Sequence, residues 1–484
     1  MTVGGRRALR HDPRVIRRPP EVHGAAFDLL VVGGSLFACA LARDAACAGL
    51  RTLLVAPDDF GARGRQRGWL AAGLDAGAAA AGVARAFADR EWLLRMAPHR
   101  VRPARALVVA AGSDSGPADV MPRLRRLAAA TPGSTLPPPQ AIVPELARCL
   151  WPELTMDAAA SAVLAFDAVL DEAGLARNLA RDAAAAGAAI WPRSNVVRVG
   201  LDGVEVHAPW CDRRAVTRAA VTFAAEDPVA VAATFRVDVA ARLVMETGAR
   251  VALATAQPEI ARIASGGVGV LEAAPSDVMA DAWWRAGVAD GRADACWRDV
   301  PGLTLEPQAV QSIVMAPSLP QLVVEETVAG KFASKSSSPL RAVTAARLTR
   351  ERLFPNAAPN GCRAICGGGG VRAPLEPLWR RHGSDAAIVA RLAGASADAA
   401  RVVCPHRGVL AAEVDFALAV DAAVRFEDVV RRLFCDASCP DSECLRRAHG
   451  RYLRGAGEHV ADADPGAAIA AALAALAPLP KPPR

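Results

Sequence analysis

The sequence predicts an α/β fold that begins with a βαβ unit, continues with an antiparallel sheet and ends in a helical part. Residues 27–32 are an apolar run of strand length, a Gly-Gly pair ends it, residues 36–48 have helical character and residues 51–55 form a second apolar run. Short β-like runs alternate with turns between residues 197 and 237, which indicates antiparallel strands. From residue 375 onward, apolar residues recur at helical spacing.

The βαβ unit carries part of a dinucleotide-binding motif. In G-x-G-x-x-G the glycines allow a tight turn, approach of pyrophosphate to the backbone and close packing of helix on strand. Those three positions hold Gly33, Ser35 and Ala38, and Ala56 stands where an acid normally binds the ribose, with Asp59 following it. Two interpretations stay open from these residues: a nucleotide site with a weakened motif, or a βαβ unit without a nucleotide.

Length and charge limit the function classes. With 484 residues, 52% of them hydrophobic, the chain is long enough for two or three domains. Its 57 Lys and Arg against 50 Asp and Glu give a net charge of +7, but opposite charges are interleaved. Because no basic stripe with interleaved aromatic residues occurs, we expect no nucleic-acid binding.

The first 24 residues form a basic tail with six arginines. It lacks the apolar core of a secretory signal, and no stretch of the chain reaches the length of an apolar membrane span. We therefore expect a cytoplasmic protein. The tail is either solvated or in contact with anionic lipid, which would make the protein peripheral at the inner face of a membrane.

Eleven cysteines without a secretory signal predict free thiols in a reducing compartment. Cys435, Cys439 and Cys444 are clustered, and Cys404 precedes His406 in "CPHRG". Zinc sites commonly use closer cysteine pairs, so the spacing predicts no metal site and leaves buried or idle thiols as the ordinary interpretation.

Several sequence blocks occur in an order that resembles one known family. They are "DLLVVGG", "LVAPDDF", "REWLLRMAPHRVRP", "FDAVLDEAGLARNLARDAAAAGA", "ARLVMETGARV", "VAGKFASKSS" and "LAAEVDFALAVDAAVRFEDVVRR". Together they resemble the FAD-dependent, aerobic, quinone-linked glycerol-3-phosphate dehydrogenases, and this chain is similar to a divergent member. The shared order of these weak motifs is stronger support for the resemblance than any single motif.

The resemblance implies a Rossmann-like FAD-binding domain of the glutathione-reductase/D-amino-acid-oxidase type, an antiparallel-sheet substrate domain and a C-terminal helical cap. The implied ranges are a basic tail (1–24), FAD-binding parts (25–110, 171–200, 239–256 and 321–355), a connection with the start of the substrate domain (111–170), an antiparallel segment (201–238), a shortened substrate domain (257–320), a helical domain (370–460) and an Ala/Pro tail (461–484).

The resemblance also implies a function and a site. It implies FAD as cofactor, sn-glycerol 3-phosphate as substrate, dihydroxyacetone phosphate as product and quinone as electron acceptor; it assigns no oligomeric state. Lys331 is the implied catalytic cation near the flavin. The implied cofactor-binding residues are Gly33, Gly34, Ser35, Ala38, Asp59, Thr247, Gly248 and Gly330.

The chain departs from the family where the substrate should bind. The segment "GARGRQRGWLAAGLDAG" has Ala71 in place of the family's histidine and Asp75 in place of an arginine. A carboxylate at Asp75 would repel a dianionic phosphate, so Arg65 and Arg67 are the substitute phosphate ligands. They are equally compatible with a solvated turn.

Three functional hypotheses follow. The first is an FAD-dependent oxidoreductase of the glycerol-3-phosphate dehydrogenase type. The second is a degenerate relative that keeps the fold, has lost flavin binding or turnover and acts as a binding or regulatory protein. The third is a thiol or metal protein that uses the cluster from Cys435 to Cys444. The departures at Ser35, Ala56 and Asp75 favour the second, whereas the block order and Lys331 favour the first.

Overall fold

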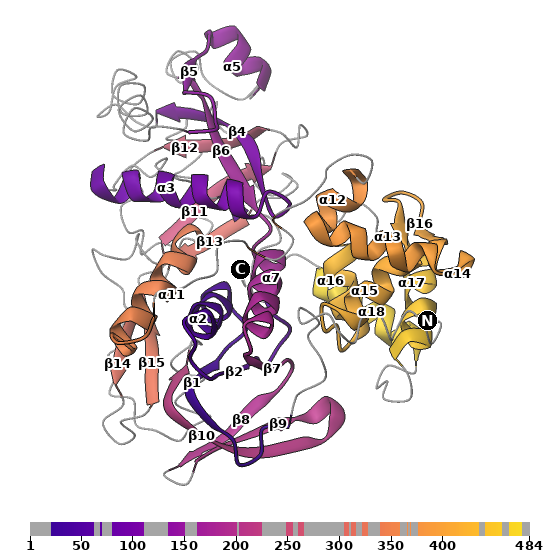
Figure 1. The fold of residues 1–484 in the computed structure, drawn as a ribbon. Coiled ribbons are helices and arrows are strands. Elements are labelled where there is room, and N and C mark those ends of the chain that lie inside the picture. Colours follow the sequence, from indigo (N-terminus) through magenta and orange to yellow (C-terminus); the bar gives the residue numbers. More distant parts are fainter. Residues whose placement is uncertain are drawn as a thin grey trace, which may run out of the picture.

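The computed structural model describes residues 21–61, 68–69, 80–110, 134–150, 162–200, 203–224, 248–254, 260–265, 304–308, 311–315, 322–327, 339–358, 365, 368, 376–434, 441–456 and 464–476. Figure 1 shows two sheets with their helices and, beside them, a group of C-terminal helices.

The first sheet is eight-stranded and has a parallel centre. In spatial order its strands are β14 (Gln311–Met315), β15 (Leu322–Thr327), β10 (Arg213–Ala224), β1 (Ala26–Val32), β2 (Thr52–Val55) and β7 (Ala189–Trp191), with β8 (Asn195–Gly200) and β9 (Gly203–Ala208) joined through β10. Strands β15, β10, β1, β2 and β7 run parallel to one another, whereas β14 pairs antiparallel with β15 and β9 pairs antiparallel with β10. From β1 the chain continues to β2 on one side of β1, and it returns later to form β10 on the other side, so the strand order reverses at β1. Ligands of such sheets bind beyond the carboxyl ends of the strands near this reversal.

Strand β1 is buried on both faces, which explains its uninterrupted apolar sequence. Leu29 and Val31 belong to one core, together with residues of three helices that cover this face. Those helices are α2 (Leu36–Cys47), α7 (Glu172–Ala185) and α11 (Pro339–Leu353). Leu30 and Val32 point to the other face and share a second core with residues of β8 to β10. The alternation is the two-residue period of a strand.

The second sheet has seven strands and is mostly antiparallel. In spatial order they are β13 (Thr304–Gln308), β11 (Gly248–Ala254), β12 (Ile260–Ser265), β4 (Val101–Ala110), β6 (Val163–Leu170) and β3 (Gly68–Trp69), with β5 (Gln140–Ala141) paired to β6. Helix α3 (Ala80–Met96) packs against both β4 and α11, and the short α5 (Pro144–Leu150) follows β5. The second sheet is thereby joined to the helical layer of the first.

One strand lies in a different sheet from the one the sequence predicts. The resemblance assigns residues 239–256 to the FAD-binding domain, and of these the structure describes residues 248–254. Instead Gly248 begins β11, which pairs antiparallel with β12 and β13 in the second sheet. Residues 248–254 therefore belong to the second sheet and not to the first.

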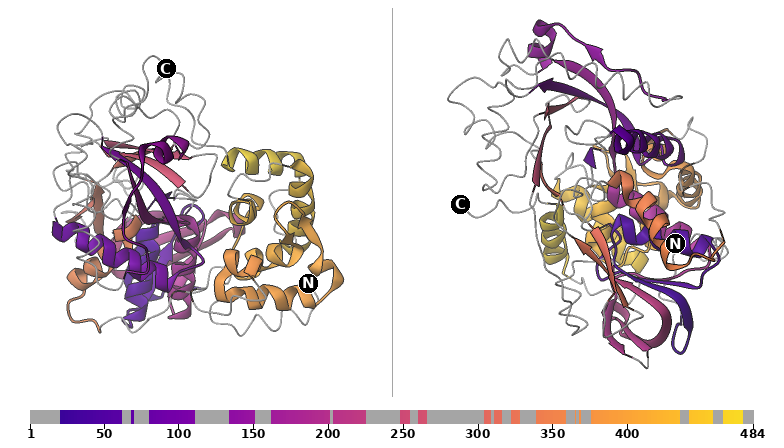
Figure 2. Two further views of the ribbon diagram at one scale, coloured as in Figure 1. Left: turned by 90° about the horizontal axis from the view of Figure 1, so that it is seen from above. Right: turned by 90° about the vertical axis from the view of Figure 1, so that its left-hand side faces the viewer.

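The C-terminal part is helical and forms its own cores beside α7 (Figures 1 and 2). Its elements are α12 (Glu376–His382), η3 (Gly383–Asp385), α13 (Ala386–Gly394), α14 (Ala397–Ala400), β16 (Val402–Cys404), β17 (Val409–Leu410), α15 (Ala411–Ala419), α16 (Phe426–Leu433), α17 (Ser442–Ala456) and α18 (Pro465–Leu476). Phe426, Val430, Leu445 and Tyr452 are buried in one of these cores. We call this part the helical cap.

These elements confirm the predicted fold class. Residues 36–47 are a helix, close to the predicted bounds of 36–48, and residues 52–55 are a buried strand. No helix among the described residues is long and apolar enough to cross a bilayer. The expectation that every thiol is free is wrong for Cys47, which is disulfide-bonded.

Candidate functional site

The glycine turn after β1 has the geometry of a dinucleotide-binding turn. Gly33 has φ 140°, a conformation that favours glycine, and its N–H donates to the carbonyl oxygen of Val55 at 2.8 Å. The chain then enters α2 at Ser35, which has an extended backbone and is the N-cap residue. The Ser35 Oγ accepts a hydrogen bond from the Ala38 N–H at 3.2 Å. The turn therefore aims the N-terminus of α2 beyond the carboxyl end of β1.

Close packing around the turn requires small residues at two further positions. A Cβ on Gly34 would lie 3.3 Å from the Asp59 carbonyl oxygen, which is tighter than ordinary contact. Gly61 has φ 69°, and a Cβ there would lie 2.5 Å from the Cα of Ala173. The Gly61 N–H also donates to the Gly34 carbonyl oxygen at 2.7 Å. The loop after β2 is thus packed between the glycine turn and the start of α7.

The start of α2 suits a phosphate group. Ser35 is exposed, while Leu36 and Phe37, the first residues of the helix, are buried. The first amides of a helix have no partner within it, and the helix dipole favours an anion there. Among the described residues, the Leu36 and Phe37 amides have no side-chain cap, because Ser35 Oγ serves Ala38. These two amides can donate to a pyrophosphate, and Ser35 places a side chain where the motif has its second glycine.

The ribose end of the site lacks the usual acid. Ala56 is fully buried at the end of β2. Its N–H donates to the Trp191 carbonyl oxygen at 3.0 Å, and its own carbonyl oxygen accepts from the Ser194 N–H at 2.8 Å. Ala56 thus fills a packed position between β2 and β7. Its methyl group offers no hydrogen bond to a ribose hydroxyl.

Asp59, which follows Ala56 in the same loop, is paired with the helical cap. Both of its carboxylate oxygens accept hydrogen bonds from Arg432 of the helical cap, each at 2.8 Å. Asp59 is 2% exposed. Burial raises the pKa of Asp59, and nearby Asp428 adds to this, while the Arg432 guanidinium acts in the opposite direction. The Asp59 carboxylate thus joins the helical cap to the loop after β2, and its contact with the cofactor stays a prediction.

Further buried ion pairs hold the helical cap against α7 and β7. Arg181 on α7 lies 2.8 Å from Asp385 and 3.3 Å from Asp421. Burial acts to raise the pKa of Asp421, but Arg181 and Arg432 lower it. Arg193, which follows β7, donates from Nε to Asp428 at 3.0 Å. Charged groups buried in this way are normally paired.

Sequence reasoning missed this ion-pair network. One pattern on α7 could have indicated buried ion pairs. Arg177 and Arg181 are four residues apart among apolar residues and therefore share one helix face. Both side chains are buried. The acidic partners of Arg181 come from the helical cap, and one of them, Asp385, is 204 residues away in the sequence. Only the fold brings them together.

Several predicted site residues lie outside the described residues. They are Lys331, Gly330, Thr247, Arg65 and Arg67. Gly33, Gly34, Ser35 and Ala38 are brought together at the start of α2, as predicted from the motif. Gly248 lies in the second sheet, where its backbone is paired with Gln308.

The parallel sheet and the glycine turn define a dinucleotide-binding α/β domain. Residues 28–261 match the family model described as FAD dependent oxidoreductase (DAO). The chain therefore carries an FAD-dependent oxidoreductase domain of this family, and the cofactor of that family is FAD.

Known proteins similar to this chain include glycerol-3-phosphate dehydrogenases. One from Synechocystis sp. (strain ATCC 27184 / PCC 6803 / Kazusa) is 37% identical over 94 residues, which are 18% of this chain and 17% of the relative. The chain thus spans less than a fifth of that relative's length in the match. The X-ray structure of the glycerol-3-phosphate dehydrogenase from Bacillus halodurans complexed with FAD has a TM-score of 0.58 and 14% identity, over 93% of this chain and 94% of that chain. At this identity the likeness shows the fold.

A further solved structure is the L-alpha-glycerophosphate oxidase from Mycoplasma pneumoniae with FAD bound. It has a TM-score of 0.46 and 14% identity, covering 69% of this chain and 96% of that chain.

Proposed function

We propose that the chain binds FAD with the pyrophosphate at the start of α2 and oxidises the secondary alcohol of sn-glycerol 3-phosphate. The observation that carries the proposal is the glycine turn at Gly33, which directs the first amides of α2 past the edge of the parallel sheet. The family match over residues 28–261 supports the cofactor. The solved and curated glycerol-3-phosphate dehydrogenases support the choice of first substrate.

The residues of this chain would bind and orient the cofactor. Leu36 and Phe37 would donate backbone hydrogen bonds to the pyrophosphate, and Gly34 would allow the close packing of the loop after β2. Bound FAD supplies the acceptor for the two electrons of an alcohol oxidation. Lys331, which follows Gly330 in sequence, would place a cation near substrate or flavin. Arg65 and Arg67 would bind the phosphate of the substrate.

Electron transfer to a quinone is the second part of the proposal. The basic residues of the first 24 positions support a peripheral contact with an anionic membrane surface, where a quinone is available. Sedimentation with vesicles that contain anionic lipid checks the contact. Binding should weaken as salt is added, and it should disappear when the six arginines of the tail are replaced by serine.

Anaerobic reduction by substrate tests the oxidoreductase directly. The full chain is loaded with FAD, freed of excess cofactor and mixed with glycerol 3-phosphate, with glycerol as the phosphate-free comparison. Bleaching of the flavin band by glycerol 3-phosphate alone is the expected result. A soluble quinone should then restore the band. Retention of the band in the presence of glycerol 3-phosphate, with FAD bound, would reject this substrate.

Lys331 and its neighbour Lys335 offer a matched pair of variants in the same segment. Lys331→Ala should abolish flavin reduction by substrate while the protein still binds FAD. Lys335→Ala should reduce normally. Equal reduction rates in both variants would remove Lys331 from the site.

A second candidate function is a binding or regulatory protein that keeps the fold without turnover. The specific observation in its favour is at the ribose position, where Ala56 is fully buried and Asp59 is paired with Arg432. A folded chain that takes up no FAD from excess cofactor would favour this candidate over the oxidoreductase.

A further inference from the structure

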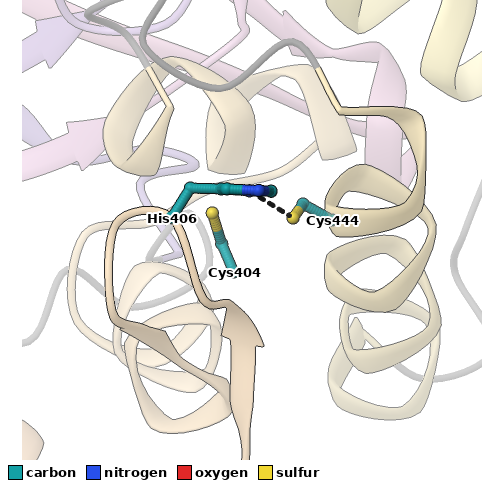
Figure 3. Close-up of side chains that lie close together, drawn as sticks. All are labelled: Cys404, His406 and Cys444. Atoms are coloured by element: carbon teal, nitrogen blue, oxygen red, sulfur yellow. Dashed lines mark hydrogen bonds between the residues drawn. The ribbon is translucent and has the colours of Figure 1, made fainter.

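Three side chains of the metal-ligating type meet in the helical cap, away from the glycine turn. Cys404 ends β16, His406 lies in the turn between β16 and β17, and Cys444 lies in the first turn of α17. One ligand atom from each lies within 4.8 Å of the other two. Figure 3 shows His406 facing Cys444, with Cys404 beside them. The hairpin thus supplies two ligand atoms and the helix supplies the third.

The spacing of these atoms matches that of ligands on one ion. The distance from His406 Nδ1 to Cys444 Sγ is 3.6 Å. A tetrahedral ion with bonds of about 2.3 Å to sulfur and about 2.0–2.1 Å to nitrogen holds those two atoms about 3.6 Å apart. A hydrogen bond explains one such pair, but it does not explain why the Cys404 thiol converges on the same point.

Local structure favours this convergence. Gly408, with φ 59°, allows the tight turn that returns the chain from His406 to β17. Cys444 lies at the N-terminus of a 15-residue helix, where the helix dipole stabilises a thiolate. Both cysteines are buried and His406 is exposed, so this cluster of three side chains is covered by protein on one side and faces solvent on the other.

We propose that Cys404, His406 and Cys444 are ligands of a thiophilic metal centre, a zinc ion or an iron–sulfur cluster. Two thiolates and an imidazole suit these metals and do not suit magnesium or calcium, which take oxygen ligands. Histidine is found with cysteine in both zinc sites and iron–sulfur centres. The sequence predicts no metal here because Cys444 is 38 residues from His406.

A fourth ligand would complete a closed structural site. Asp441 is the described candidate, because its Oδ2 lies 3.6 Å from Cys444 Sγ. The centre ties the β16–β17 hairpin to α17, so removal of the metal should loosen the helical cap and leave the glycine turn unchanged.

Metal analysis of the anaerobically purified full chain tests the proposal. Zinc, iron and acid-labile sulfide are measured per chain. About one zinc per chain identifies a mononuclear site, and iron with matching sulfide identifies a cluster. His406→Ala changes an exposed side chain and should fold, yet it should weaken metal binding by more than the roughly 10- to 100-fold that loss of a ligand's hydrogen-bond partner costs. Cys149→Ser, an exposed cysteine on α5, is the control that keeps the metal.

Reconstitution with cobalt gives a second readout that the wild-type chain alone can provide, so the test does not depend on whether a buried cysteine variant folds. The wild-type chain should show thiolate-to-cobalt charge transfer, which weakens in Cys404→Ser and in Cys444→Ser if they fold and disappears in the double variant. Asp441→Asn tests the fourth position in the same way. Wild-type protein without stoichiometric metal after both isolation and reconstitution would overturn the proposal. A disulfide between Cys404 and Cys444 in metal-free protein would also overturn it.

Discussion

Arg432 of the helical cap donates one hydrogen bond from each terminal nitrogen to Asp59, which follows β2. Both side chains are buried. The pair joins two parts of the chain that are 373 residues apart, at the loop that also packs on the glycine turn. The helical cap and the nucleotide-binding edge of the first sheet therefore share one buried contact.

Replacing Arg432 with methionine should destabilise the protein by about 3–5 kcal/mol, because it leaves the Asp59 carboxylate buried without its partner. Asp59→Asn combined with Arg432→Met should recover much of this loss, since no isolated charge remains. Chemical denaturation of the two single variants and the double variant measures the coupling. Additive losses in the double variant would mean that the pair contributes nothing as a pair.

Ser35 tests whether its side chain obstructs the pyrophosphate. Ser35→Gly restores the small residue of the motif and should tighten FAD binding roughly tenfold, which is about 1.4 kcal/mol. Ser35→Ala keeps a Cβ and loses the hydrogen bond to the Ala38 amide, so it should cost about 0.5–2 kcal/mol in stability without the same gain in affinity. Titration with FAD, followed by flavin fluorescence, compares the three proteins. Weaker binding by Ser35→Gly would contradict a pyrophosphate at this turn.

The sequence predicts the first βαβ unit well because its strands and helix are local and strongly patterned. Residues 36–47 have the expected helical character, and Ser35 caps α2 by a local hydrogen bond. The pairing of strands that are far apart in the sequence cannot be predicted in this way. Strand β11, which begins at Gly248, lies in the second sheet because it pairs with β12 and β13, and no local pattern specifies these partners.

The sequence likewise predicts the parts of the candidate site that are local in the chain and misses the contacts between distant segments. The glycine motif locates the phosphate-binding end of the site, since its residues lie close together in the chain. The resemblance assigns Asp59 to the cofactor, and the sequence gives no sign that Arg432 lies beside it. The meeting of His406 with Cys444 was hidden for the same reason, because the hairpin and the helix are brought together only by the packing of the helical cap.

Gly61 should tolerate no side chain. Gly61→Ala introduces a left-handed alanine, which costs roughly 1–2 kcal/mol, and places its Cβ 2.5 Å from the Cα of Ala173. Gly49 has a similar φ of 85° but nothing within 4 Å of a new Cβ, so Gly49→Ala measures the conformational cost alone. Thermal unfolding should show a larger loss for Gly61→Ala. Equal losses would mean that the loop after β2 shifts freely away from α7.

Glu413 makes the helical cap sensitive to acid. Burial acts to raise the pKa of Glu413, but hydrogen bonds and charge from His382 and Arg381 outweigh it and lower the pKa to about 2. Because the folded-state pKa lies below the usual value, the stabilisation is complete above about pH 5 and is lost as the pH falls toward 2. The shift corresponds to roughly 3 kcal/mol.

Unfolding measured between pH 7 and pH 2 checks this dependence. Glu413→Gln should be less stable than wild type at pH 7 and should lose less stability on acidification. Glu443→Gln, which changes an exposed acid on α17, serves as the control and should follow the wild-type curve. A Glu413→Gln curve parallel to wild type would assign the acid sensitivity to other groups.

The most direct test of a flavin site at the start of α2 is the visible absorption spectrum of the purified full chain. The spectrum is recorded before and after incubation with excess FAD and removal of the unbound cofactor. We expect about one flavin per chain, released on heating, because the Gly33 turn and the first amides of α2 fit the pyrophosphate. Folded protein that carries no flavin band after this treatment would contradict the site.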